Sequence, residues 1–64
     1  MRLQIDGSVG AGYTIADLDG DIATEVVRSV AGLREVLGLM RAPRDVVDGV
    51  VFGLDFQRSI QINY

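Results

Sequence analysis

Three glycines, Gly7, Gly10 and Gly12, stand in the stretch GSVGAG, and glycine-rich loops of this kind can hold a phosphate group. A P-loop has the pattern G-x-x-x-x-G-K-[ST], in which a lysine reaches the phosphates, and this chain contains no lysine. The dinucleotide fingerprint G-x-G-x-x-G is not matched either. Its glycines are separated first by one residue and then by two, whereas Gly7, Gly10 and Gly12 show the reverse order. We therefore interpret the stretch as a turn, since glycine supplies the positive φ angles of a tight loop.

Asp17, Asp19 and Asp21 alternate in the stretch DLDGD, as the first ligands of an EF-hand calcium loop do. Such a loop also needs glycine at its sixth position and glutamate at its twelfth, where this chain has Ile22 and Arg28. A weak calcium or magnesium site of another kind remains an open alternative. The preferred interpretation is an acidic turn without a metal, whose last residue, Asp21, caps the N-terminus of a helix.

The usual catalytic side chains are missing from the sequence, which has no histidine, no cysteine and no lysine. Ser8, Ser29 and Ser59 have no evident base that would activate them as nucleophiles. Paired carboxylates can also catalyse hydrolysis, but a chain of 64 residues leaves little room for a substrate cleft between them. We predict a protein that is not an enzyme and has no catalytic residue, cofactor or small-molecule substrate.

All six basic residues are arginines, and three of them, Arg34, Arg41 and Arg44, are close enough in sequence to form a basic patch. The preferred interpretation is a solvated helix end, where cations favour the helix dipole. Nine acidic residues give a net charge of −3, which argues against binding to nucleic acid. A ribbon-helix-helix regulator remains an alternative, because Arg2 and Gln4 share the polar face of a strand that such a protein would place against DNA.

The two terminal segments alternate between apolar and polar residues, which is typical of half-buried strands. The apolar positions are Met1, Leu3 and Ile5 in the first segment, and Phe56, Ile60, Ile62 and Tyr64 in the second, which covers residues 55–64. Residues 13–16 are predicted to form a hairpin with the first strand across the glycine-rich turn. A further hypothesis is that the two terminal strands pair, within one chain or between chains.

An apolar stripe at spacings of three and four residues predicts a main helix over residues 21–38. The stripe consists of Ile22, Val26, Val30, Leu33, Leu37 and Met40. Asp21 would cap the start of this helix, and Gly38 would end it.

The stretch 43–52 has two interpretations that the sequence leaves open. In the first, Pro43 occupies the first position of a short helix and Asp45 lies at the third, near the helix dipole. In the second, Asp48 and Gly49 form the turn of a hairpin between two valine-rich strands. The short helix is the preferred interpretation.

Together these elements predict one α+β domain over residues 1–64. A two- or three-stranded antiparallel sheet, formed by the terminal strands and residues 13–16, would pack on the main helix and the short second helix. The predicted core consists of Leu3, Ile5, Ile15, Ile22, Val26, Val30, Leu33, Leu37, Val47, Val50, Val51, Ile60 and Ile62.

The chain is 48% hydrophobic, although a domain of this size buries only about 60% of its unfolded surface. The surplus predicts a non-catalytic interaction or assembly module that forms a homo-oligomer or docks on a larger complex, such as a bacterial or phage accessory component. The alternatives are a small acidic inhibitor or antitoxin-like binder of another protein, and the dimeric regulator described above. The predicted interface consists of Leu3, Ile5, Phe56, Ile60, Ile62 and Tyr64.

The N-terminal stretch MRLQIDG lacks the long apolar region of a signal peptide. No run of the sequence approaches the roughly 18 apolar residues of a membrane span. We therefore expect the protein in the cytoplasm or within a larger assembled particle, without contact with a membrane.

Overall fold

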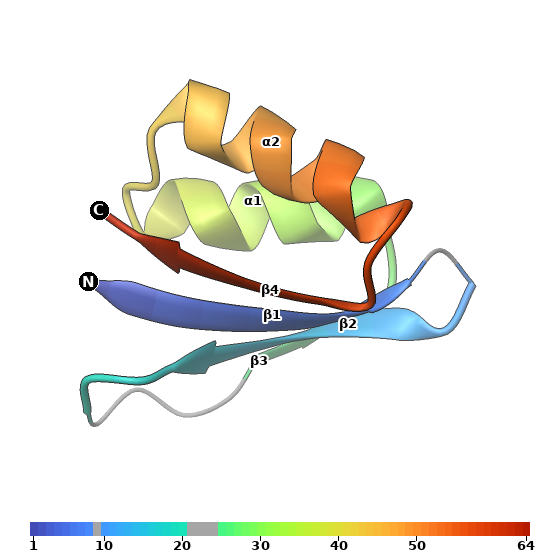
Figure 1. Ribbon diagram of the computed structural model, residues 1–64, viewed down its shortest axis with the longest axis horizontal. Helices are drawn as coiled ribbons and strands as arrows, with labels where there is room; N and C mark the ends of the chain where they lie inside the picture. The colour runs from blue at the N-terminus through green and yellow to red at the C-terminus, as the bar shows by residue number, and fades with distance from the viewer. Residues whose placement is uncertain (9, 21–24) are drawn as a thin grey trace.

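The computed structural model describes residues 1–8, 10–20 and 25–64, and two helices cover one side of an antiparallel sheet in it (Figure 1). Along the chain the elements are β1 (Arg2–Ser8), β2 (Gly12–Asp17), β3 (Glu25–Val27), α1 (Val30–Leu39), α2 (Arg44–Leu54) and β4 (Ser59–Asn63). The strand order is β3-β2-β1-β4. The predicted α+β class is therefore confirmed, but the sheet has four strands instead of two or three.

The first strand, β1, is central and pairs with a neighbour on each side. Ile5 lies opposite Ile15 of β2 and opposite Ile60 of β4, so three isoleucines line up across the sheet. The hypothesis that the terminal strands pair is confirmed, and the pairing occurs within one chain. Because residues far apart in sequence meet here, this contact holds the two ends of the chain together.

The glycine-rich stretch forms the turn between β1 and β2, as predicted. Gly7, Gly10 and Gly12 have φ angles of 134°, 89° and 89°, a region that residues with a Cβ atom rarely adopt. The backbone N–H of Ala11 donates to the carbonyl of Ser8 at 3.2 Å and closes the turn. The stretch therefore reverses the chain.

The main helix begins later than predicted, at Val30. Ser29 is its N-cap, and the Ser29 hydroxyl accepts a hydrogen bond from the N–H of Gly32 at 3.0 Å. Residues 25–27 form β3 against β2, so the prediction of helix there was wrong, and Val26 is 67% exposed instead of in the core. Adjacent β-branched valines favour a strand, and the serine supplies the cap that a helix start requires. The predicted cap at Asp21 and the core position Ile22 lie outside the described residues.

Helix α1 also ends later than predicted, beyond Gly38. Arg41 adopts the left-handed conformation, with φ 63°, and its N–H donates to the carbonyl of Gly38 at 3.0 Å. The N–H of Ala42 donates to the carbonyl of Leu37 at 3.0 Å. These two bonds form the Schellman motif, which satisfies the last carbonyls of the helix. The C′ residue beyond the helix is thus Arg41, and Gly38 lies within the helix.

Residues 44–54 form α2, so the helical interpretation of the stretch 43–52 is confirmed and the hairpin is excluded. The helix begins one residue later than predicted, so Pro43 is its N-cap, with ψ 147°, instead of its first residue. Asp45 lies in the first turn. Neither helix of the described residues has both the length and the apolar character that crossing a membrane requires.

The last strand is shorter than predicted and begins at Ser59 instead of near residue 55. The N–H groups of Phe56 and Gln57 donate to the carbonyl of Gly53 at 3.0 and 2.9 Å. These two residues form a turn that directly follows α2. Their N–H groups satisfy a carbonyl of the last helical turn, which has no donor within the helix. Phe56 is therefore in the turn, and it does not share a strand face with Ile60.

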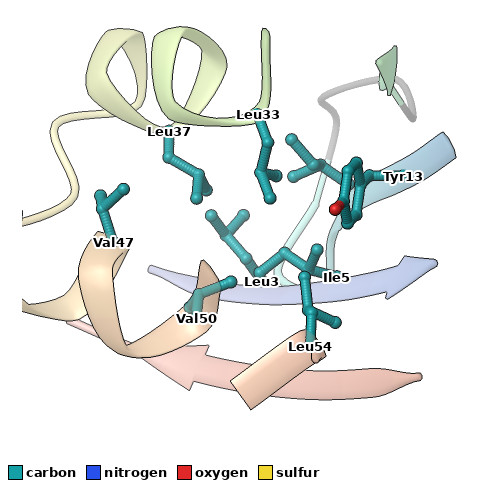
Figure 2. Packing of buried hydrophobic residues seen from close by; sticks show 9 residues of the cluster. Leu3, Ile5, Tyr13, Leu33, Leu37, Val47, Val50 and Leu54 are labelled. Carbon is teal, nitrogen blue, oxygen red and sulfur yellow. The ribbon is translucent and has the colours of Figure 1, made fainter. Parts of the chain in front are cut away.

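The core lies between the sheet and the two helices (Figure 2). Among the described residues, its nine buried members are Leu3, Ile5, Tyr13, Ile15, Leu33, Leu37, Val47, Val50 and Leu54. Tyr13 and Leu54 are additions to the predicted core, and Val30, Val51, Ile60 and Ile62 pack against it while only partly buried. The alternation along β1 and the helical spacing in α1 and α2 account for which residues point inward.

Candidate functional site

The structure places five of the six predicted interface residues in three groups. Leu3 and Ile5 have no exposed surface, because they lie under the helices in the core, and so they offer nothing to a partner in this fold. Ile60 and Ile62 are half-buried, and they occupy the helix-facing side of β4. Phe56 stands apart in the turn after α2 and is 77% exposed. Of these five residues, only those of β4 and of this turn reach the surface.

Tyr64, the sixth residue, is fixed by contacts on the helix-covered side of the sheet. Its hydroxyl donates to the carbonyl of Met40 at 2.7 Å. Its N–H donates to the carbonyl of Met1 at 3.0 Å, and its carbonyl accepts from the N-terminal amine of Met1. Partial burial, together with the charge of Asp17, raises the pKa of the Tyr64 hydroxyl above its usual value. These contacts point to a structural role for the tyrosine.

Phe52 and Phe56 form the largest exposed aromatic feature among the described residues. Their ring centroids are 5.2 Å apart with an interplanar angle of 55°, and the two residues are 68% and 77% exposed. The rings are adjacent because the turn that follows α2 keeps residues 52 and 56 one helical turn apart. The sequence prediction missed Phe52. The spacing of four between two phenylalanines was the signal that could have found it.

The face of the sheet opposite the helices is not covered by any described element (Figure 1), and the residues that β1 and β4 present there are polar. The Gln4 amide nitrogen donates to the Ser59 hydroxyl at 3.0 Å and to Asp6 Oδ1 at 3.2 Å. The Gln61 amide nitrogen donates in turn to Gln4 Oε1 at 3.1 Å. The Ser59 hydroxyl, followed by the Gln4 amide, lowers the pKa of the Asp6 carboxyl. The polar groups of this face thus satisfy one another across two strands.

The acidic turn after β2 is held by an arginine. The Asp19 carboxylate accepts from the Arg2 side chain (Nε) at 2.8 Å and from the Arg2 backbone N–H at 3.0 Å. The N–H of Asp19 donates to Asp17 Oδ1 at 2.8 Å. The Arg2 guanidinium lowers the pKa of the Asp19 carboxyl. Among the described residues no three acidic, histidine or cysteine side chains are placed to hold a metal, and Asp21 lies outside them.

The three arginines of the predicted basic patch have different surroundings. Arg34 of α1 forms an ion pair with Asp48 of α2, with 2.6 Å between Nη1 and Oδ1, so its charge is balanced between the helices. Arg41 follows Met40, the C-cap of α1, and Arg44 is the first residue of α2. In the described part of the chain no pocket opens that could enclose a small molecule.

Comparison with known proteins adds no identification. No protein-family model matches the chain, and neither a curated protein nor a solved structure matches it. The function therefore has to be argued from the surface itself.

Proposed function

We propose that this chain is a non-catalytic interaction or assembly module that contacts a protein surface through Phe52 and Phe56. The observation that carries the proposal is the exposure of both rings, 68% and 77%, side by side at the end of α2. Exposed apolar side chains that gather in one place mark interaction sites, whereas scattered ones are ordinary.

The aromatic pair has the properties of an interface anchor. Aromatic side chains are enriched at protein interfaces and bury a large area with few rotatable bonds. The backbone that carries the two rings is already ordered, because the N–H of Phe56 is bonded to the carbonyl of Gly53. Ordering costs on binding are correspondingly small. Asp55 and Arg58, which are close to the pair in sequence, are exposed and polar, as are the residues at the rim of such sites.

The two alternative functions receive less support. A ribbon-helix-helix regulator would need its N-terminal strand to pair with a second copy, but β1 has β2 on one side and β4 on the other. An acidic inhibitor would need a concentrated negative surface, whereas Asp19 and Asp48 are each paired with an arginine. The aromatic pair favours an apolar contact over both.

A photoreactive phenylalanine analogue at position 52 tests the proposal in cells that produce the chain. We expect the analogue to crosslink the chain to one discrete protein, which is either another copy or a different protein. The matched control places the same analogue at Glu35, an exposed position of α1. The crosslink from position 52 should also decrease in the variant Phe56→Ser. Equal yields from positions 52 and 35, or no product from either, would overturn the proposal.

A further inference from the structure

We propose that β4 pairs antiparallel with β4 of a second copy, around a two-fold axis at Gln61, so that two sheets become one. This surface is different from the Phe52–Phe56 pair, and the inference does not depend on the function proposed above. Three features of the chain support this pairing: the direction of the backbone groups of β4, the sequence of β4 and the position of the helix above it.

The backbone of β4 has one set of hydrogen-bonding groups directed away from the chain. Arg58 accepts from the N–H of Gly7, and Tyr64 donates to the carbonyl of Met1. Backbone groups of an antiparallel strand point alternately to its two sides. The N–H and C=O groups of the even-numbered residues of β4 therefore point toward β1. The N–H and C=O groups of Ser59, Gln61 and Asn63 consequently face outward at the edge of the sheet.

The sequence of β4 is complementary to itself when two copies run antiparallel. With Gln61 opposite the second copy's Gln61, Ser59 lies opposite Asn63, and all three outward-facing residues can exchange backbone bonds. In the same register Ile60 lies opposite Ile62 on the helix-facing side. Both isoleucines are only partly buried within one chain, and this pairing would cover their remaining surface. No other register pairs all five residues.

β4 also lacks the features with which proteins protect the edges of their sheets. Charged side chains, proline and bulges are the usual protection, and the strand SIQIN contains no charge and no proline. Like charges opposite one another would oppose self-pairing, and none occurs within this strand. The other edge strand, β3, has three residues and includes Glu25, so it is a poorer template.

Helix α2 leaves space for the second copy. A Cβ atom at Gly53 would lie 2.6 Å from Ile60 Cδ1, so this side of α2 faces β4, and Gly49 one turn earlier has open space around it. Helix α2 packs on both β4 and β1, so the α2 helices of two copies would lie beside each other above the joined sheet. The absence of a side chain at Gly49 would let the two helices approach.

A single cysteine on the proposed axis tests the pairing directly, because the chain has none of its own. In Gln61→Cys the two sulfur-bearing residues would have Cα atoms about 5.5 Å apart, which suits a disulfide. The matched control is Gln4→Cys, on the same face of the sheet but in the central strand. We expect the disulfide dimer of Gln61→Cys to form at least about tenfold faster, because pairing raises the effective thiol concentration to the millimolar range.

A second pair of variants tests the outward N–H of Gln61. Proline is tolerated in an edge strand where its nitrogen faces solvent, so Gln61→Pro should remain folded by circular dichroism. We expect the Gln61→Pro dimer to dissociate at a concentration at least about tenfold higher than the Gln61→Thr dimer does. This ratio is a tenfold increase in Kd, or about 1.4 kcal/mol. Gln61→Thr keeps the N–H but also loses the side-chain bond to Gln4, and it should retain the wild-type mass in light scattering.

The outcomes separate the two proposals. A wild-type chain that remains monomeric at high micromolar concentration overturns the β4 pairing, and so does equal oxidation of Gln61→Cys and Gln4→Cys. A dimer that Gln61→Pro leaves intact overturns it as well. Because β4 pairing also brings α2 of a second copy close, crosslinking from position 52 supports the aromatic contact only where the product persists in Gln61→Pro.

Discussion

The two faces of the sheet differ in what their residues contact. On the covered face Leu3 and Ile5 are fully buried beneath the helices. On the open face Gln4 and Asp6, which alternate with them along β1, form hydrogen bonds on the surface. Burial of apolar area is the main stabilising contribution to folding, so stability should depend on the covered face. The open face is then free to vary without unfolding the chain.

The strongest test of this comparison is Leu33→Ala in α1, paired with Val26→Ala in β3. Leu33 is fully buried and Val26 is 67% exposed. We expect Leu33→Ala to lower the free energy of unfolding by about 2–5 kcal/mol, because it removes buried contacts and leaves a cavity. Val26→Ala should change it by less than about 0.5 kcal/mol. Urea denaturation followed by circular dichroism measures both, and similar losses would contradict the comparison.

A second test concerns the end of the hairpin, where Gly7 and Gly10 both have positive φ angles. A Cβ atom at Gly7 would lie 2.1 Å from the carbonyl oxygen of Gly12, whereas one at Gly10 would meet nothing within 4 Å. The backbone conformation alone costs about 1–3 kcal/mol for a residue other than glycine, and Gly7→Ala adds the steric clash. We expect Gly7→Ala to lower the melting temperature clearly more than Gly10→Ala. The reverse order would contradict this description of the turn.

Tyr64→Phe tests a polar contact on the covered side. The variant removes the hydrogen bond from the Tyr64 hydroxyl to the carbonyl of Met40 and keeps the ring. We expect a loss of about 0.5–1.5 kcal/mol in the free energy of unfolding, the usual contribution of one hydrogen bond. Chemical denaturation measures the change. No loss would show that water replaces the hydroxyl at Met40 without penalty.

The smallest effect is expected from the exposed ion pair of Asp19 with Arg2. The pKa of the Asp19 carboxyl is lowered from 3.8, so the folded state binds this proton less readily than the unfolded state. The stabilisation is therefore present above pH 3.8 and is lost as the pH falls through the lower pKa of the folded chain. We expect the melting temperature of Asp19→Asn to vary less with pH in this acidic range than that of the wild type. Identical pH profiles would contradict the assigned role.

The sequence was sufficient where a local pattern decides the structure. The alternation in residues 1–6 and 55–64 predicted the two terminal strands, and the valine spacing in 43–52 favoured the second helix over a hairpin. The prediction of helix failed at Val26. Its spacing fits the apolar stripe of the predicted main helix, but its pairing with Thr14 of β2 depends on another part of the chain. Leu3 and Ile5 were predicted both as core residues and as interface residues. The helices that cover them bury both side chains, which leaves only the core role.

The pairing of β1 with β4 has a consequence for the kinetics of folding. The hairpin of β1 and β2 closes a short loop, whereas the pairing of Arg2 with Asn63 brings together nearly the whole chain. Loop closure over longer separations costs more entropy and slows folding. We therefore expect β4 to dock late, which leaves one edge of the central strand open until then. An open edge can pair with another chain, so this interval is when the protein is most exposed to aggregation.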